Sequence, residues 1–319
     1  MRFLITGAAG FLGSALANRL VADGHSVRGL DDLSTGDPSA LSPEVHFIRG
    51  DVNDRPKLWT LLQDVDCVYH LAARVLVPES ILYPREYAAA NIDGTVSMME
   101  AIRDVGIRRL VLASSGAIYG NQNEQPISES VVPIPRSPYA VSKLAAEYFV
   151  NTIGEINNID TVCLRIFNAY GPGQHIPPVH APVIMSFLKH ALGNGTLVVH
   201  GDGSQTRDYI YVDDVVNALV AAATATDVNR QIINIGSGEE TSLKELVRLV
   251  LKVTGRKPEV VYNLRSDAGN NRMAADISLA ARKLRWKPLI DLETGIRYTM
   301  ERDPRFAAKL TSTETTPIT

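Results

Sequence analysis

The chain has 319 residues, of which 45% are hydrophobic and 21% are charged, and its formal net charge is −3. This composition is typical of a globular protein with one large or two modest domains. The small negative charge gives no electrostatic basis for binding nucleic acid or an anionic membrane.

From Met1 to about Arg165, short apolar runs alternate with longer helical patterns. Strands are predicted over residues 2–6, 26–31, 45–50, 66–72, 108–114 and 160–166, and helices over residues 10–24, 84–106 and 137–153. The strands are apolar throughout, which is typical of strands buried on both faces. We therefore expect an α/β protein with a doubly wound parallel sheet. Cys67 and Cys163 lie within these strands and are expected to be buried thiols.

The second half predicts a smaller α/β lobe that binds the substrate. Helices are predicted over residues 182–193, 214–225 and 242–255, and strands over residues 196–201 and 231–236. The helix at 214–225 and the strand at 231–236 are expected to return to the first sheet. The expected division is therefore residues 1–167 plus about 213–235 for the sheet domain, and about 168–212 plus 236–302 for the lobe. The polar tail, 303–319, is expected to be flexible.

No run of 18 apolar residues occurs, and the chain starts on a predicted strand rather than on a basic and apolar leader. From the sequence we expect a soluble, cytoplasmic protein without a membrane partner.

A glycine-rich segment at residues 6–13, TGAAGFLG, follows the first predicted strand directly. In a dinucleotide-binding turn, the first glycine allows the turn, the second lets a pyrophosphate approach the backbone, and the third lets helix and strand pack closely. Glycine-rich turns alone are common, but here a strand and a helix flank the turn. We expect a Rossmann-type site in which the helix start binds phosphate. Its residues are Gly7, Gly10, Phe11, Leu12 and Gly13.

Acidic residues follow the second and third predicted strands. Asp31 and Asp32 are placed to bind the adenosine ribose of NAD, where a carboxylate would repel the extra phosphate of NADP. The alternative is that they only open the following turn. Asp51, followed by Val52, is expected either to bind the adenine amino group or to cap a helix starting near Arg55. The expected cofactor is NAD, and no metal site is expected.

The predicted helix at 137–153 places Tyr139 and Lys143 on one face, because they are four residues apart. A phenol has an ordinary pKa of about 10, and a neighbouring ammonium favours its phenolate form. Ser114 and Ser115 end an apolar strand, where ligands bind in α/β sheets. We expect Tyr139 to be the base, Lys143 its charge partner, Ser115 a bridge to the substrate hydroxyl, and Ser114 a cofactor contact. The alternatives are a surface lysine on an ordinary amphipathic helix and a serine-rich turn.

The combined pattern resembles the extended short-chain dehydrogenase/reductase family, in its epimerase/dehydratase branch. The motifs that carry the resemblance are TGAAGFLG (6–13), GDV (50–52), HLAA (70–73), SSGAIYG (114–120), YAVSK (139–143), LRIFNAYGPGQ (164–174), QTRDYIYVDD (205–214), NIGSG (234–238), ADIS (275–278) and LRWKP (284–288). They are spread in order over residues 1 to about 302.

The resemblance implies further site residues. For the cofactor these are Leu71, Ala72, Ala73 and Asn91, although Asn91 could be only a buried helix residue. For a nucleotide diphosphate they are Asn168, Arg207 and one of Arg265 and Arg272, between which the spacing does not decide. His200 stands where relatives carry an aromatic residue against uracil. The alternatives are a turn residue for Asn168 and ordinary surface arginines.

The resemblance also implies a reaction. Related dehydratases and decarboxylases carry acidic residues after the catalytic Ser or Thr, whereas this chain has Gly116 and Ala117. That leaves 4-epimerisation of a UDP-hexose through oxidation at C4, rotation of the 4-keto sugar and re-reduction. UDP-glucose and UDP-galactose are the expected pair, and UDP-glucuronate or UDP-N-acetylhexosamine is the alternative. A nucleotide-sugar reductase and a non-enzymatic NAD-sensing protein are further alternatives.

Two features of the sequence depart from the pattern of the relatives. Val75 stands where relatives place a lysine, and residues 174–182, QHIPPVHAP, are unusually rich in His and Pro for a substrate-facing region. The family implies a homodimer through two long helices of each subunit, here the predicted helices at 84–106 and 137–153.

Overall fold

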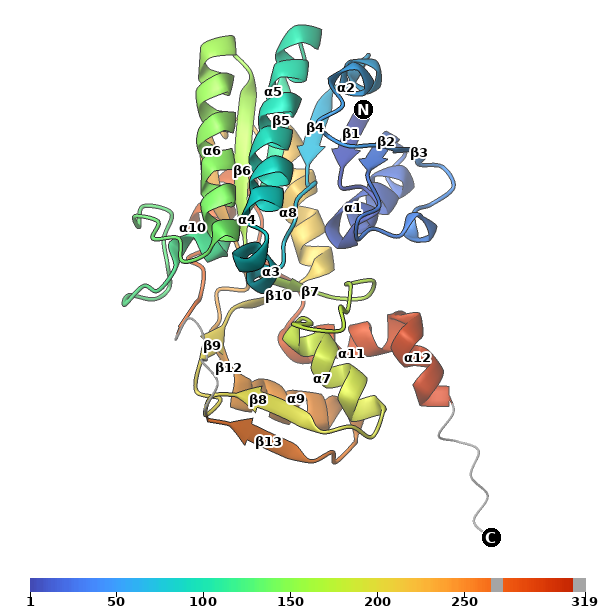
Figure 1. The fold of residues 1–319 in the computed structure, drawn as a ribbon, viewed down its shortest axis with the longest axis vertical. Coiled ribbons are helices and arrows are strands. Elements are labelled where there is room, and N and C mark those ends of the chain that lie inside the picture. The colour runs from blue at the N-terminus through green and yellow to red at the C-terminus, as the bar shows by residue number, and fades with distance from the viewer. Residues whose placement is uncertain (265–271, 312–319) are drawn as a thin grey trace.

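The computed structural model describes the backbone of residues 1–264 and 272–311 (Figure 1). Its centre is a seven-stranded sheet in the order β11-β6-β5-β4-β1-β2-β3, with every neighbouring pair parallel. The strands are β1 (Arg2–Thr6), β2 (Ser26–Asp31), β3 (His46–Arg49), β4 (Cys67–His70), β5 (Arg109–Ser115), β6 (Asp160–Ile166) and β11 (Gln231–Ile235). The expected doubly wound α/β fold is confirmed, and the strand order reverses between β1 and β4.

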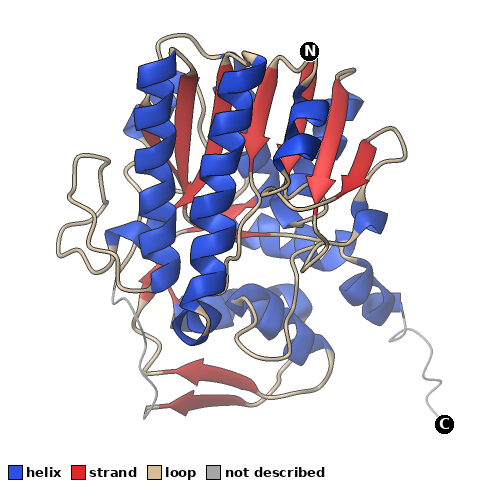
Figure 2. Cartoon of the chain, turned by 45° about the horizontal axis from the view of Figure 1, so that its top comes forward, coloured by secondary structure: helices blue, strands red, loops and turns tan. Residues whose placement is uncertain are grey.

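Helices cover both faces of the sheet (Figure 2). One face carries α1 (Phe11–Ala22) and α8 (Val212–Thr224), and the other carries α2 (Arg55–Leu62), α5 (Gly94–Val105) and α6 (Pro138–Asn157). The alternating direction of side chains along a strand divides the apolar residues between these two layers. On β1, Phe3 and Ile5 belong to the core under α1 and α8, and Leu4 belongs to the core under α2, α5 and α6. Both cysteines are buried, as expected.

The helix expected over 84–106 is interrupted. It consists of α4 (Pro84–Ala88), a π-helical turn η2 (Ala89–Asp93) and α5, and it follows a short helix α3 (Val77–Leu82). Asn91 lies in this turn, and its buried amide donates to the Arg74 carbonyl at 3.0 Å and to the Ser142 hydroxyl at 2.9 Å. A single π-helical turn inside a helix is common beside functional sites. Here it places Asn91 between the β4 loop and α6.

The second half of the chain forms a lobe below the sheet (Figure 1). Its paired strands are β7 (Asn168–Tyr170) with β10 (Tyr209–Tyr211), β8 (Leu197–His200) with β13 (Val260–Asn263), and β9 (Thr206–Arg207) with β12 (Thr241–Ser242). Its helices are α7 (Val183–Leu192), α9 (Leu243–Thr254) and α11 (Leu292–Arg302). As predicted, β11 pairs with β6, and α8 packs on α1. The remaining elements are α10 (Ser278–Leu284), which packs beside β11, and the turns η1 (Pro38–Ala40) and η3 (Gly116–Tyr119).

The expectation of a flexible tail from Asp303 is wrong for the described part. Residues Pro304–Thr311 form α12, and the Phe306 side chain is buried against the main core. The buried Asp303 carboxylate accepts from the Gly173 amide at 3.0 Å and pairs with Arg305. The polar composition of this segment predicted a flexible end because an average composition does not show that one aromatic side chain, Phe306, and one buried carboxylate, Asp303, anchor it.

Candidate active site

A large cleft opens at the carboxyl ends of the parallel strands, between the sheet and the lobe. Its volume is about 1110 Å³. Its walls come from the glycine loop, the ends of β2 and β5, the first turns of α6, the loop after β6 and the residues around Asp303. The cleft lies where the strand order reverses, which is the position at which open α/β sheets bind ligands.

The glycine loop meets the steric demands inferred from its spacing. Gly7 has φ +70°, and a Cβ on it would lie 2.7 Å from the Ala72 amide nitrogen. A Cβ on Gly13 would lie 1.9 Å from the Gly7 carbonyl oxygen, so only glycine allows α1 to pack this closely on the turn. Gly10 is the N-cap of α1 and offers no side chain, so the first turn of the helix faces the cleft through its backbone. Such a turn binds phosphate through N–H groups and the helix dipole.

Asp31 hydrogen-bonds to the backbone of the glycine loop. One carboxylate oxygen accepts from the Ala9 amide at 2.9 Å, and the other accepts from the Leu33 amide at 2.8 Å. Burial raises the pKa of Asp31, and the hydrogen bonds from these amides oppose that shift. The residue therefore opens the turn and also lines the cleft, so the two interpretations of Asp31 are compatible. Asp32 lines the cleft as well, and its carboxylate accepts from the Ser34 amide at 2.8 Å.

The helix-cap alternative for Asp51 is wrong. Asp54 is the N-cap of α2, and its carboxylate accepts from the Lys57 amide at 3.1 Å. Asp51 instead accepts from the Asn53 amide at 2.8 Å and, with Val52, lines the cleft. The sequence offers more than one acidic residue before α2 as an N-cap, and the position where the helix begins in the structure makes Asp54 the N-cap.

Ser115, Tyr139 and Lys143 come together at the end of β5. The Ser137 side chain accepts from the Ala140 amide at 3.2 Å, and with Pro138 it starts α6 directly beside the strand end. Tyr139 is buried beside the cleft, and Ser115 is close enough to influence the pKa of its phenol. Lys143 donates from Nζ to the Ala113 carbonyl at 2.9 Å.

The electrostatics of this cluster differ from the expectation in one respect. Burial raises the pKa of Tyr139, and the hydrogen bond with Ser115 only partly opposes it. Burial also lowers the pKa of Lys143 to about 8, against an opposing effect of Glu147. The expected lowering of the phenol pKa by the ammonium is therefore not seen in this arrangement. Desolvation dominates because both groups are buried, and the lysine is directed to the Ala113 carbonyl.

A buried chain of hydrogen bonds supports the cleft from behind. His70 lies between Thr6 and Thr95, with its Nδ1 2.8 Å from one hydroxyl and its Nε2 3.0 Å from the other. Because Thr95 donates to the Asn91 carbonyl at 2.7 Å, His70 donates from Nε2 and accepts at Nδ1. Burial lowers the pKa of His70 to about 3, so the ring stays neutral. Asn91 thus supports the HLAA segment, of which Leu71, Ala72 and Ala73 line the cleft.

Comparison with known proteins matches residues 3–236 to the model of the NAD dependent epimerase/dehydratase family. A UDP-glucose 4-epimerase from Mycolicibacterium smegmatis is 38% identical over 308 residues, covering 94% of this chain and 98% of that protein. The solved structure of a UDP-glucose 4-epimerase from Thermotoga maritima, with UDP-glucose, superposes with a TM-score of 0.92 at 32% identity and covers 97% of this chain and 100% of that one. A UDP-glucuronic acid 4-epimerase from Bacillus cereus, in complex with UDP-glucuronic acid and NAD, has a TM-score of 0.86 at 31% identity, covering 94% and 98%.

The chain belongs to this family. The resemblance stated from the motifs is confirmed, as are the NAD-dependent class and the epimerase type of enzyme.

Of the residues expected to bind the nucleotide, Asn168 lies in the cleft wall, whereas His200, Arg207 and Arg272 lie on the lobe outside it. Asn168 lines the cleft, and its amide donates to the Asp208 carbonyl at 2.9 Å. Arg207 is half-buried one residue before Asp208, and burial lowers the pKa of its guanidinium. His200 is exposed at the end of β8, and neither it nor Arg207 lines the cleft itself. Arg272 is exposed and pairs with Glu240. The alternative cation, Arg265, lies outside the described residues.

Several residues of the site were not singled out from the sequence. The cleft also contains Ser34 and Thr35 after β2 and the segment Asp303–Arg305. Glu147 and Arg165 form a buried ion pair directly behind Ser114, whose hydroxyl donates to Glu147 rather than into the cleft. Glu147 could have been found because it follows Lys143 at the same four-residue spacing that links Tyr139 to Lys143.

Proposed function

We propose that the protein is a UDP-hexose 4-epimerase, with UDP-glucose and UDP-galactose as its substrate pair. The observation that carries the proposal is the grouping of Ser115 and Tyr139, with Lys143 one helical turn further along α6, in the wall of a dinucleotide-type cleft. Gly116 and Ala117 stand where related dehydratases carry acidic residues, so this chain lacks the acid that dehydration needs. A Cβ on Gly116 would make a tight contact, 3.0 Å, with the Phe167 ring.

The residues fit NAD. The loop of Gly7, Gly10 and Gly13 leaves room for a pyrophosphate at the start of α1, and the paired amides at Asp31 keep a carboxylate at the ribose position. Phe11, Leu12, Asp32, Asp51, Val52 and the HLAA segment would surround the rest of the molecule, with Asn91 behind them. A carboxylate at the end of β2 favours NAD over NADP. When bound, NAD would take up a hydride from C4 and give it back.

The chain's own residues would handle the proton. Tyr139, as phenolate, would take the proton from the C4 hydroxyl, and Ser115 would hold that hydroxyl and the phenol oxygen together. Lys143, while protonated, would favour the phenolate as the reaction proceeds. On the return step, the Tyr139 hydroxyl would give the proton back to the oxygen at C4. No net proton or electron is consumed, as an epimerase requires.

Inversion at C4 requires the nucleotide to stay bound while the sugar turns. We propose that Asn168 and Arg207 hold the diphosphate, together with Arg265 or Arg272, and that His200 lies against the uracil. The hydrogen bonds made by Asp208, the residue after Arg207, support this arrangement. Its buried carboxylate accepts from the amides of Ser237, Gly238 and Ala275, so the strand carrying Arg207 is fixed to the lobe.

The identity of the sugar is the finer part of the proposal. The family members that resemble this chain include enzymes named for UDP-glucose and for UDP-glucuronate. The loop at residues 174–182 borders the cleft, and its Gln174, His175 and Pro177 line it. UDP-glucuronate and UDP-N-acetylhexosamine are therefore the alternatives to test.

We also propose a homodimer through α6 and its neighbours. Val141, Tyr148, Phe149 and Ile156 are exposed on α6, and Ile81 and Leu82 are exposed on α3. The spacing of seven and eight residues from Val141 to Tyr148 to Ile156 places these side chains along one stripe of the helix. With the helix over residues 84–106, which packs beside α6 as α5, two subunits would bring four helices together at such an interface. A cytoplasmic location stays a prediction; no helix in the described ranges is long and apolar enough to cross a membrane.

Turnover tests the proposed function. The purified protein would be incubated with UDP-glucose, UDP-N-acetylglucosamine and UDP-glucuronate in separate reactions, and the products separated by chromatography. We expect the 4-epimer of UDP-glucose to form fastest. Absence of a 4-epimer in all three reactions would contradict the proposal.

A further inference from the structure

One face of α6 lies against the end of β5. Residues at four-residue intervals along the helix each contact one of three consecutive strand residues. The pairs are Tyr139 with Ser115, Lys143 with Ala113, and Glu147 with Ser114. The first two pairs belong to the proposed catalytic machinery, and the third, Glu147 with Ser114, lies directly behind it.

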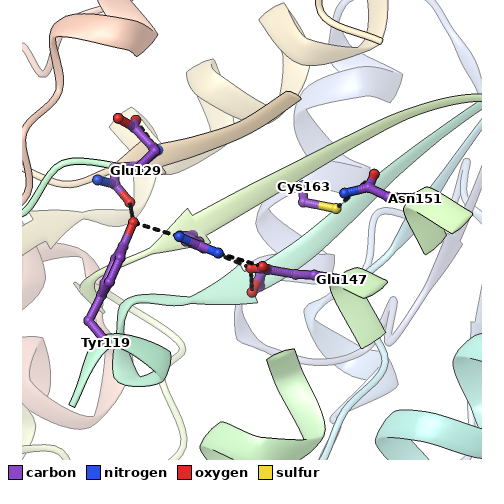
Figure 3. Close-up of polar contacts among 8 residues, drawn as sticks. Tyr119, Glu129, Glu147, Asn151 and Cys163 are labelled. Carbon is purple, nitrogen blue, oxygen red and sulfur yellow. Dashed lines mark hydrogen bonds and ion pairs between the residues drawn. The ribbon is translucent and has the colours of Figure 1, made fainter. Parts of the chain in front are cut away.

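Glu147, which Figure 3 labels, is deeply buried, with an exposed fraction of only 1%, and it forms an ion pair with Arg165 on β6. The guanidinium donates from Nε to Oε1 at 3.0 Å and from Nη2 to Oε2 at 2.7 Å, which is a two-point contact. Arg165 is also the direct β6 neighbour of Ser114 in the sheet. Since a buried carboxylate without a partner is strongly disfavoured, this ion pair allows Glu147 to remain charged.

Arg165 is itself fixed on its other side. Its Nη1 donates to the Tyr119 hydroxyl at 2.8 Å, and the guanidinium lies 4.8 Å from the centre of the Tyr119 ring. The Tyr119 hydroxyl donates to the Asn234 side-chain oxygen at 2.7 Å, and the Asn234 backbone N–H donates to the Glu129 carboxylate at 2.8 Å (Figure 3). The carboxylate of Glu147 is therefore the first member of a series of hydrogen-bonded side chains that ends at Asn234 on β11.

The charge of Glu147 matters to Lys143. Burial lowers the pKa of the Lys143 ammonium, and the negative charge one helical turn away opposes this effect. The titratable groups that influence the ammonium, or are influenced by it, are Glu147 on α6 and His70 at the end of β4, and Tyr139 lies one turn earlier on the same helix. Glu147 is the one carboxylate among these groups.

We propose that Glu147, held by Arg165, is a positioning residue for the epimerase site. Its carboxylate anchors the Ser114 hydroxyl, and with it the strand end that carries Ser115. It also keeps a fixed negative charge behind the Lys143 ammonium. This role rests on the proposed function, because it concerns the base pair of Tyr139 and Lys143.

The test compares Glu147→Gln with the wild type and with Glu155→Gln. Glu155 lies on the same helix, but its side chain is exposed and pairs with Arg230 at the surface. The first measurement is ¹⁵N NMR titration of the lysine side chains, with the Lys143 signal assigned from a Lys143→Met variant. We expect the Lys143 pKa to fall by about one unit or more in Glu147→Gln and to stay unchanged in Glu155→Gln. This measurement needs no substrate, so its outcome is independent of whether the proposed sugar is correct.

The second measurement is the pH profile of kcat, taken with whichever UDP-sugar the wild type turns over. The high-pH limb should move to lower pH by the same amount as the Lys143 titration, while KM changes less than about twofold, since no substrate contact is removed. Glu147→Asp keeps the charge and should restore most of the limb. An unchanged Lys143 titration in folded Glu147→Gln would overturn the proposal, as would a loss of kcat at every pH without movement of the limb.

A second variant covers failure to fold. Glu147→Gln leaves Arg165 as an unpaired buried charge, which could prevent folding. The double variant Glu147→Gln, Arg165→Gln removes both charges, and in it the Lys143 pKa should still lie below the wild-type value, because the nearer, negative charge is gone. A wild-type titration in the double variant would likewise refute the role of Glu147.

Discussion

Adding one methyl group to the glycine loop should have different effects at two positions three residues apart. We expect Gly10→Ala to weaken NAD binding and Gly13→Ala to destabilise the fold. At Gly10 the backbone has φ −77° and ψ 175°, which alanine adopts freely, and a Cβ would lie 3.2 Å from the Gly7 carbonyl oxygen. At Gly13 the same methyl group would lie 1.9 Å from that oxygen. At the first site, which faces the cleft, the methyl group makes a tight contact that a shift of a few tenths of an ångström relieves, whereas at the second site there is no room for it.

The magnitudes follow from these contacts. For Gly10→Ala, the loss of a favourable N-cap, about 0.5–1 kcal/mol, is offset by a similar entropic gain from a less flexible unfolded chain. A methyl group against the pyrophosphate should remove about one charge-assisted hydrogen bond, roughly 1.5–3 kcal/mol. The Kd for NAD should therefore rise about ten- to a hundredfold at nearly unchanged Tm. Gly13→Ala forces α1 away from the turn, which we expect to cost about 3 kcal/mol and to lower Tm by ~5–10 °C.

The assay is calorimetric titration of NAD into cofactor-free protein, combined with thermal melts of the same samples. Each variant is the control for the other, because both add one methyl group to the same loop. A Gly10→Ala protein that binds NAD like the wild type would refute the placement of the pyrophosphate at the start of α1. A Gly13→Ala protein with a wild-type melt would show that the close helix–turn packing is not required.

Four further predictions concern the chemistry, the substrate site and the assembly. Tyr139→Phe should lower kcat by about 10²–10⁴-fold at unchanged Tm, because the ring still packs against Tyr87 and only the proton-transfer group is lost; full activity would remove Tyr139 from its role. With wild-type protein, kcat should fall as pH rises through about 8, because the buried Lys143 then loses the charge that favours the phenolate; a profile flat to pH 10 would argue against that. Arg272→Ala should raise KM by less than about threefold, because the Arg272 guanidinium makes an exposed ion pair with Glu240. Arg207→Ala, measured in the same assay beside Arg265→Ala, should raise KM more than about tenfold. Tyr148→Lys places a charge on the exposed α6 stripe and should give monomers by light scattering, while a dimer of wild-type stability would disprove the proposed interface.

The sheet and the catalytic cluster could be predicted from the sequence because their signals are local. Most strands of the central sheet contain two or more consecutive apolar residues, as in β1, β4 and β5, and Ser115 lies at the end of β5. Tyr139 and Lys143 share a helical face through spacing alone, and the glycine loop follows β1 at once. These features are properties of neighbouring residues, so a linear pattern contains them.

The features missed from the sequence depend on contacts between distant segments. The short strands of the lobe, such as β9 with two residues, exist only through pairing with β12 across more than thirty residues of chain. The π-helical turn at Asn91 is fixed by Arg74 and Ser142 on other elements. The anchoring of α12 depends on the pairing of Asp303 with Gly173. The ion pair of Glu147 with Arg165 likewise joins two elements that a linear pattern leaves separate.

The measurement that tests the central claim most directly follows the hydrogen at C4. UDP-glucose carrying deuterium at C4 would be incubated with the protein in ordinary water, and the product examined by NMR and mass spectrometry. If Tyr139 moves only the hydroxyl proton and the C4 hydrogen returns as hydride, UDP-galactose will form with its deuterium retained at C4. Formation of UDP-galactose with the deuterium exchanged for solvent hydrogen, or no 4-epimer at all, would contradict the account.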